Sequence, residues 1–413
     1  MPRARCGVRR LVPVPEKTSV FENLKALPPD AILRLIAEHE NDPRAHKIDL
    51  GVGVYRDEHG ATPVLSAVKK AERRLIEGQM TKAYLGSGGD PVFNDAMQRQ
   101  MFGDAASGND RIATVQTPGG SGSLRVAAGL ILRAMPDVSV WTSDPTWANH
   151  VPLLGGAGVR LKTYPYYDMQ GRSIRFDAML ETMNAIPPGD IVLLHGCCHN
   201  PTGMDLDRGQ WREAAAVIES RGLLPFIDFA YQGFAEGLEE DAFPVRLMFE
   251  RVPEMIVASS CSKNFGLYRE RVGSLSLVAA NAAATAIVRS QVFNIIRTMY
   301  SMPPDHGAAV VASILTDPDL RTEWLAELLA MRSRLKETRK LLVASLRDKA
   351  PAHDFSHIER GNGMFSFLGV SGEQVSRLKS EFGVYMVDSG RINVAGITRG
   401  NVSYLGESIA AVL

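Results

Sequence analysis

Short apolar runs and amphipathic stretches alternate along most of the chain. The apolar runs are continuous, as in strands that are buried on both faces, and they include VSVWTS (138–143), DIVLLHG (190–196), LLPFIDF (223–229) and MIVASS (255–260). The amphipathic stretches LSAVKKAERRLIEG (65–78) and QWREAAAVIESRG (210–222) repeat apolar residues at the spacing of a helix. This alternation predicts βαβ units, and therefore an α/β protein whose mainly parallel sheet is covered by helices on both faces.

The pattern changes near residue 320. EWLAELLAMRSRLKETRKLLVASLRD (323–348) is typical of one long amphipathic helix. It is followed by three shorter apolar segments, GMFSFLG, YMV and RINVAG, and by a terminal helical pattern. This change predicts a separate, smaller C-terminal domain, and a chain of 413 residues is long enough for two domains.

The charge balance excludes several classes of partner. The chain has 46 basic and 46 acidic residues, so it lacks the positive field that holds nucleic acid or an anionic membrane surface. The four cysteines do not have the spacing of a disulfide framework or a zinc site, which favours a reducing cytoplasm. The longest apolar stretch, SLSLVAANAAATAIV, is shorter than the roughly 20 residues of a membrane-spanning helix. We therefore expect a cytoplasmic protein with no nucleic-acid, membrane or metal partner.

The first 19 residues differ in composition from the rest of the chain. They contain four arginines and one lysine against one glutamate, and they lack the apolar region of a secretory signal. We expect residues 1–20 to be a disordered extension or the product of a misplaced start codon, with an arginine-rich transit peptide as the alternative.

Unusual residues follow several of the predicted strands, where ligands gather in an open α/β sheet. TPGGSGSLRVAAGL (117–130) places glycines before an apolar helix, which offers free backbone N–H groups to an anion. A tight loop without a ligand would have the same pattern. The segment lacks the spacing of a P-loop or of a dinucleotide fingerprint, so it indicates a ligand smaller than a nucleotide.

Each of the other strand-end residues also has an ordinary explanation. A strand-terminal carboxylate such as Asp228 is usually a cap or turn residue, His195 and His199 fit partly buried histidines, and Trp147 fits a core residue. The stretch ASSCSKNFGLYRERVG (258–273) is harder to explain in this way, because it places Lys263 directly after a buried apolar run.

Together these features match the requirements of a pyridoxal phosphate site: a lysine that forms Schiff bases, hydroxyls and an arginine for a phosphate, a buried carboxylate, and an aromatic ring. From Phe21 onward the chain resembles the class I (fold type I) aminotransferases, specifically the aspartate and aromatic amino acid aminotransferases. The motifs that match, in order, are LGVGVYRDEHG, TPGGSGSLR, HGCCHNPTG, DFAYQGF, SSCSKNFGLYRER and SGRINVAG.

The resemblance implies a fold type I transferase, with a large domain built on a mostly parallel seven-stranded sheet and a smaller α/β domain. We expect an N-terminal arm and part of the small domain over residues 21–62, the large cofactor-binding domain over 63–330, and the small C-terminal domain over 331–413.

The resemblance also assigns the cofactor site. Lys263 would bind pyridoxal 5'-phosphate covalently and then move the substrate proton, and Asp228 would keep the pyridine nitrogen protonated. His150, and behind it His195, would orient Asp228. The full set of implied cofactor-binding residues is Tyr84, Gly120, Ser121, Gly122, Trp147, His150, Asn200, Asp228, Tyr231, Ser260, Ser262, Lys263 and Arg271.

The substrate would contact five residues by the same resemblance: Gly53, Trp147, Asn200, Arg297 and Arg391. Arg391 would bind the α-carboxylate. The resemblance implies that Tyr84 is catalytic together with Lys263 and Asp228, and that Arg297 meets a distal carboxylate of the substrate. In this family, the residues at the positions of Tyr84 and Arg297 come from the other subunit. A homodimer with shared active sites is therefore expected.

The predicted substrates are aromatic amino acids and aspartate, with 2-oxoglutarate as the amino acceptor. Strict aspartate enzymes typically have polar residues where this chain has Ala83, Met302 and Ser121, and a lysine where it has Arg56. The loss of polar groups makes the substrate pocket larger and more apolar, and an apolar pocket favours aromatic side chains. Three alternatives stay open: an aspartate-preferring aminotransferase, a non-catalytic protein that binds the cofactor, and a decarboxylase or racemase on the same fold.

Overall fold

The computed structural model describes residues 21–27 and 30–413, so the extension predicted over residues 1–20 lies outside the described residues. The central sheet has seven strands in the order β2-β10-β9-β8-β7-β3-β4. Their bounds are β2 (Ile112–Pro118), β3 (Ser139–Asp144), β4 (Arg160–Pro165), β7 (Ile191–His195), β8 (Leu224–Phe229), β9 (Met255–Ser260) and β10 (Val272–Val278). Only β10 runs antiparallel to its neighbours, so the mostly parallel seven-stranded sheet is confirmed.

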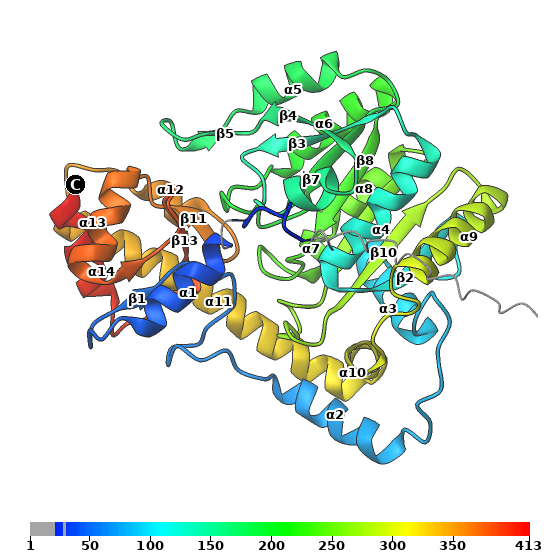
Figure 1. Ribbon diagram of the computed structural model, residues 1–413, viewed down its shortest axis with the longest axis horizontal. Coiled ribbons are helices and arrows are strands. Elements are labelled where there is room, and N and C mark those ends of the chain that lie inside the picture. Colours follow the sequence, from blue (N-terminus) through cyan, green and yellow to red (C-terminus); the bar gives the residue numbers. More distant parts are fainter. Residues whose placement is uncertain (1–20, 28–29) are drawn as a thin grey trace, which may run out of the picture.

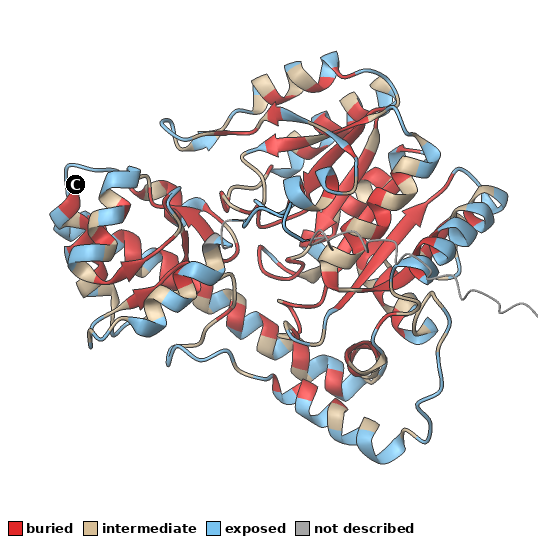
Figure 2. Ribbon diagram, in the orientation of Figure 1, coloured by how far each residue is buried: buried red, intermediate tan, exposed pale blue. Residues whose placement is uncertain are grey.

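Helices cover both faces of the sheet (Figure 1). Consecutive strand residues join opposite apolar clusters: Phe226 packs in one with Leu124, and Ile227 packs in the other with Trp211. The central strands are buried from end to end (Figure 2), which explains why their sequences are apolar without alternation. The helices are α2 (Ser66–Gly78), α3 (Pro91–Phe102), α4 (Gly119–Ala134), α5 (Phe176–Ala185), α6 (Arg208–Arg221), α7 (Leu238–Asp241), α8 (Phe243–Arg251), α9 (Ala282–Met299) and α10 (Asp305–Thr316).

Local capping explains where the predicted helices begin and end. Helix α6 begins with a reciprocal pair in which the Asp207 carboxylate accepts from the Gln210 N–H while the Gln210 side chain accepts from the Asp207 N–H. It ends at Gly222, whose φ of 62° is the left-handed conformation that glycine adopts at least cost.

The long helix expected after residue 320 is α11 (Pro318–Lys349), which runs from the region of α2 and α10 toward the C-terminal helices (Figure 1). The remaining elements are α1 (Ala31–Asn41), β1 (Ile48–Asp49), β5 (Tyr167–Asp168), β6 (Ser173–Ile174), α12 (Ser356–Arg360), β11 (Phe365–Phe367), α13 (Gly372–Phe382), β12 (Val384–Tyr385), β13 (Arg391–Asn393) and α14 (Val402–Val412). Strand β1 pairs with β12, which joins an N-terminal segment to the C-terminal part. The domain boundaries at 62/63 and 330/331 stay a prediction.

The sheet register brings the polar strand ends together. His195 at the end of β7 pairs with Asp228 of β8, which pairs in turn with Ala258 of β9. Over the described residues, no helix combines the length and the apolar character that crossing a membrane requires.

Candidate active site

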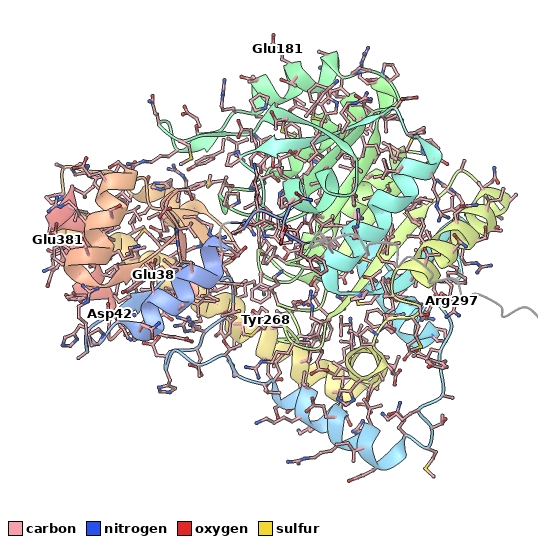
Figure 3. All side chains as sticks on the ribbon, viewed as in Figure 1. Glu38, Asp42, Glu181, Tyr268, Arg297 and Glu381 are labelled. Carbon is pink, nitrogen blue, oxygen red and sulfur yellow. The ribbon has the colours of Figure 1, made fainter. Side chains whose placement is uncertain are left out.

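A cavity of about 280 Å³ lies at these strand ends. It has the side chains of the sheet on one side and those of the C-terminal part on the other, and Tyr268, labelled near the centre of Figure 3, is one of its lining residues. The lining consists of Ile32, Gly53, Gly120, Ser121, Leu124, Trp147, His195, Asn200, Asp228, Ala230, Tyr231, Ser260, Ser262, Lys263, Tyr268, Arg271, Phe365 and Arg391. Most residues that the sequence predicted for the site are therefore in one place.

Lys263 follows β9 and places its amine over the Tyr231 ring, with Nζ 4.6 Å from the ring centre. Burial lowers the pKa of this amine from 10.5 to about 8, against an opposing effect of the Asp228 charge. An appreciable fraction of the amine is therefore unprotonated near neutral pH, as a nucleophile or a base requires.

Asp228 is buried, and its Oδ2 lies 2.9 Å from His150 Nε2. Burial alone would raise the pKa of this carboxyl, but the hydrogen bond from His150 and nearby positive charge outweigh it, and the net pKa is lowered. Thr146 Oγ1 lies 2.8 Å from His150 Nδ1 and 3.2 Å from His195 Nε2. Because a carboxylate only accepts, His150 donates to Asp228 from Nε2, whereas His195 contacts Thr146. That the two histidines orient Asp228 for the cofactor stays a prediction.

One end of the cavity is suited to an anion. Ser260 and Ser262 are buried at the end of β9, and the Ser260 hydroxyl accepts from the Ser262 N–H at 3.2 Å. The Arg271 guanidinium lies against Gly119: a Cβ at this glycine, whose φ is 71°, would be 2.6 Å from Arg271 Nη2. Glycine at position 119 therefore gives the arginine room beside the first turn of α4, where backbone N–H groups are free.

Asn200 and Tyr231 form a second polar pair. The Asn200 Nδ2 group donates to the Tyr231 hydroxyl at 3.4 Å, and the buried Asn200 Oδ1 has no partner among the described residues. Burial raises the pKa of Tyr231. Asn200 Nδ2 and the Tyr231 hydroxyl can donate to an oxygen of a ligand, whereas Asn200 Oδ1 can accept from a ligand hydroxyl.

Arg391 lies at the other end of the cavity. Its Nη2 donates to the Gly51 carbonyl at 2.6 Å, and its guanidinium lies 4.6 Å from the centre of the Phe365 ring. Burial lowers the Arg391 pKa. The buried Nε has no partner among the described residues, so the arginine keeps a donor for an acceptor such as a carboxylate.

Four predicted residues do not line this cavity. One of them, His150, lies behind the lining and contacts it through Asp228. Tyr84 is 93% exposed, and the Arg297 Nη1 group donates to Ser301 Oγ at 2.6 Å on α9, away from Tyr268 in Figure 3. Both were expected to serve a neighbouring subunit, and that expectation stays a prediction. Gly122 lies in the first turn of α4, where a Cβ would meet Pro118 at 2.8 Å, and its predicted contact with the cofactor stays a prediction.

Sequence reasoning missed Phe365, Tyr268 and Ile32 as lining residues. The Phe365 ring faces both Gly53, where a Cβ would lie 3.1 Å from it, and Arg391. An apolar residue in a short strand has no signal that distinguishes it from core, whereas Tyr268 lies inside the quoted Lys263 motif and could have been considered.

The donor set fits pyridoxal 5'-phosphate. The fit requires an amine, a buried carboxylate for a ring nitrogen, an unpartnered polar group for a phenolic oxygen, and hydroxyls with a guanidinium for a phosphate. Lys263, Asp228, Asn200 and the group around Arg271 meet these four requirements in one cavity. A mostly parallel sheet with this site defines the class of pyridoxal-phosphate-dependent enzymes.

Comparison with known proteins identifies the family. Residues 45–409 match the model of the aminotransferases of class I and II. The chain is 48% identical to the aspartate aminotransferase of Haemophilus influenzae, covering 95% of this chain and 100% of that one, and 47% identical to the aromatic-amino-acid aminotransferase of Paracoccus denitrificans, covering 94% and 99%. The crystal structure of the aromatic-amino-acid aminotransferase of Burkholderia pseudomallei, covalently bound to pyridoxal phosphate, superposes with a TM-score of 0.94 at 42% identity, covering 96% of this chain and 100% of that one.

The chain therefore belongs to the class I and II aminotransferase family and is a pyridoxal-phosphate-dependent aminotransferase of fold type I. The fold class, the activity and the cofactor that the motifs predicted are confirmed.

Proposed function

We propose that this aminotransferase moves the amino group of aromatic amino acids and of aspartate to 2-oxoglutarate. The observation behind this proposal is Arg391, a half-buried arginine whose buried Nε–H has no partner among the described residues and which lines the same cavity as the Lys263 amine. Breadth of substrate is supported by the relatives, because enzymes named for aspartate and for aromatic amino acids match the chain at 48% and 47% identity. An enzyme that prefers aspartate is the second candidate.

In the proposed mechanism, Arg391 binds the substrate α-carboxylate and thereby orients the Cα–H bond toward Lys263. The Lys263 amine, with a pKa near 8, would take the proton from Cα as a general base and deliver it as a general acid to C4′ of the bound cofactor rather than back to Cα. Pyridoxal 5'-phosphate, when bound, supplies the electron sink for the charge that develops at Cα.

The other proposed residues hold the cofactor in place. Asp228, kept ionised by His150, would pair with the ring nitrogen, and Asn200 with Tyr231 would bind the phenolic oxygen. Ser121, Ser260, Ser262, Arg271 and the N–H groups near Gly120 would bind the phosphate, and Trp147 would pack against the ring.

We also propose a cytoplasmic homodimer in which Tyr84 and Arg297 complete the site of the neighbouring subunit, with the division into an N-terminal arm, a large and a small domain as predicted. The 93% exposure of Tyr84 in a single chain supports this assembly, because a large side chain on a monomer surface is often covered by a partner.

Two arginine variants test the substrate assignment. Arg391→Ala should depress single-turnover kcat/KM for aspartate and phenylalanine together, because both substrates have the α-carboxylate. Arg297→Ala should lower kcat/KM for aspartate by about 10- to 100-fold, since a charge-assisted pair is worth about 1.5–3 kcal/mol, and change phenylalanine only a few-fold. Equal loss for both substrates in Arg297→Ala would contradict the role of Arg297, and wild-type turnover restricted to aspartate would favour the second candidate.

The shared site can be tested by mixing. Lys263→Ala and Arg297→Ala chains, dissociated and reassembled together, should regain aspartate activity, because half of the dimers then contain one site with both residues intact. If the activity of the mixed chains did not exceed the sum of the activities of the two separate variants, each site would be built from one chain.

A further inference from the structure

Arg339 is a buried arginine without an acidic partner. Its side chain, on α11, is 1% exposed, and its guanidinium forms no ion pair with a carboxylate of the described residues. Burial lowers its pKa to about 10 against the opposing effects of Cys198 and Asp205, so it is a cation at neutral pH. A buried unpaired charge costs several kcal/mol unless hydrogen bonds compensate it, so its surroundings indicate what it does.

Backbone carbonyls provide that compensation. The guanidinium donates five hydrogen bonds to four carbonyl oxygens of one segment: Nη1 to Ile358 at 2.7 Å, Nη2 to Asn362 at 2.9 Å, to Gly363 at 3.1 Å and to Phe365 at 2.5 Å, and Nε to Gly363 at 3.4 Å. Segment 358–365 is thereby fixed to α11 by a single side chain.

One side of this segment contacts the loop that contains Asn200. The Asn362 N–H donates to the Gly203 carbonyl at 2.6 Å, and Asn362 Nδ2 donates to Asp205 Oδ2 at 3.0 Å. The Asp205 carboxylate also accepts from the N–H groups of Cys198 and His199, on the opposite side of the loop.

The other end of the segment leads to Arg391. Phe365 begins β11, which pairs with β13 so that Phe367 is opposite Arg391, and the Phe365 ring packs on the Arg391 guanidinium. Arg339 therefore lies at the junction between the Asn200 loop and the strand pair that contains Arg391.

We propose that Arg339 is a positioning residue for substrate binding: it holds segment 358–365 so that Phe365 and Arg391 keep their places relative to Asn200. This inference rests on the proposed role of Arg391 in binding the α-carboxylate. Arginine suits the position because it has five N–H donors in a rigid plane, whereas lysine has three.

Two glycines make room for this planar group. A Cβ at Gly361 would lie 2.7 Å from Arg339 Nη1, and one at Gly203, whose φ is 70°, would lie 3.0 Å from Nη2 and 2.1 Å from the Phe365 oxygen. The space around the guanidinium is thus closed to larger residues on both the Asn200 loop and segment 358–365.

The test is Arg339→Lys in the cofactor-loaded protein. Calorimetric titration with 3-phenylpropionate, a carboxylate without an amino group, should give a Kd raised about 10-fold or more, while the Kd of the apoprotein for pyridoxal 5'-phosphate stays within about twofold. Hydrogen exchange should be faster in segment 358–365 and in β13. If Arg339 served stability alone, Arg339→Lys would leave the ratio of the Kd for 3-phenylpropionate to the Kd for pyridoxal 5'-phosphate unchanged, and the proposal would be wrong.

Arg111→Lys is the matched control. Arg111 also donates to backbone carbonyls, those of Val252, Pro253 and Ala279, but at the opposite end of the sheet, so its variant should keep both dissociation constants. If Arg339→Lys does not fold, Asn362→Ala, which removes only the side-chain bond to Asp205, takes its place and should weaken 3-phenylpropionate binding selectively by a few-fold.

Arg391→Ala separates the two proposals. If Arg391→Ala weakens 3-phenylpropionate binding and the Arg339 and Asn362 variants do not, the positioning role is wrong while the role of Arg391 stands. If Arg391→Ala binds 3-phenylpropionate like the wild type, the role of Arg391 is wrong, and the positioning role is overturned with it.

Discussion

The two ends of the active-site cavity are built in different ways. The phosphate end, with Ser260, Ser262 and Arg271, comes from twelve consecutive residues at the end of β9 and from the adjacent start of α4. The carboxylate end brings Arg391 together with Phe365 and Gly51, which are far apart in the sequence.

The elements that support each end differ as well. At the phosphate end, Gly273 of β10 pairs with both Ser260 of β9 and Thr117 of β2, inside strands of six or seven residues that are buried over all or most of their length. At the carboxylate end, β11 and β13 have three residues each, and side-chain hydrogen bonds to backbone carbonyls supplement the few ladder bonds. We infer that the cofactor end is fixed by the sheet, whereas the substrate end depends on side-chain contacts between distant segments.

The largest effect is expected at Lys263, which lies between the two ends. Lys263→Ala should lower half-transamination by roughly 10⁴-fold or more, because no other amine lines the cavity to transfer the proton. Both ends stay intact, so the variant should still bind pyridoxal 5'-phosphate noncovalently and 3-phenylpropionate. Stopped-flow single turnovers and cofactor titration measure the two properties, and near-native turnover would contradict the mechanism.

Asp228→Asn should have the next largest effect. It removes the negative charge opposite the ring nitrogen while keeping one side-chain oxygen that can accept from His150, so Cα deprotonation should slow by roughly 10²- to 10³-fold and the cofactor should bind more weakly. A primary isotope effect with Cα-deuterated aspartate identifies the slowed step. If the rate of Cα deprotonation were unchanged in Asp228→Asn, the role of Asp228 would be structural.

A pair of conservative variants compares the two ends directly. Arg271→Lys should raise the Kd for pyridoxal 5'-phosphate by about 10-fold and leave the KM for phenylalanine at saturating cofactor nearly unchanged, because lysine lacks the planar fork that binds a phosphate. Arg391→Lys should show the reverse pattern. If each variant changed both constants equally, the two ends would not be independent.

The smallest predicted effect is on the stability of the apoprotein. Burial holds the Lys263 pKa near 8 against 10.5 for an exposed amine, so the native state releases this proton at lower pH than the unfolded state. The cost of burying the charge is fully present below pH 8 and is relieved as the pH rises from about 8 toward 10.5. The amine lines a cavity, so it keeps part of its favourable surroundings, and the cost of burying its charge is smaller than the full pKa shift would give. We therefore expect the Lys263→Met apoprotein to be more stable than the wild type by about 1–3 kcal/mol at pH 7.

Thermal or urea unfolding at pH 7 and at pH 9.5 checks this difference. The advantage of Lys263→Met over the wild type should shrink at the higher pH, since the titration of all other groups cancels in the comparison. A constant advantage would mean that hydrophobic packing of methionine, rather than relief of the buried amine, stabilises the variant.

The sequence by itself determined the sheet, its covering helices and the cofactor end of the site. Continuous apolar runs give buried parallel strands, and the capping residues of α6 end its helix where the pattern stops. The roles of Lys263, Ser260, Ser262 and Arg271 came from the resemblance of their motif to the class I aminotransferases. The structure brings them together at the end of β9, because residues close in sequence stay close in space.

The tertiary structure decided which distant residues meet. His150 binds Asp228 across 78 residues, the Asp205–Asn362 bond spans 157, and the Arg391–Gly51 bond spans 340. No periodicity or local motif identifies Phe365 as a lining residue or Arg339 as a buried cation, because an apolar residue in a short strand and an arginine on a long amphipathic helix look ordinary. Their functions arise only when packing excludes water from them and leaves each polar group with one set of partners.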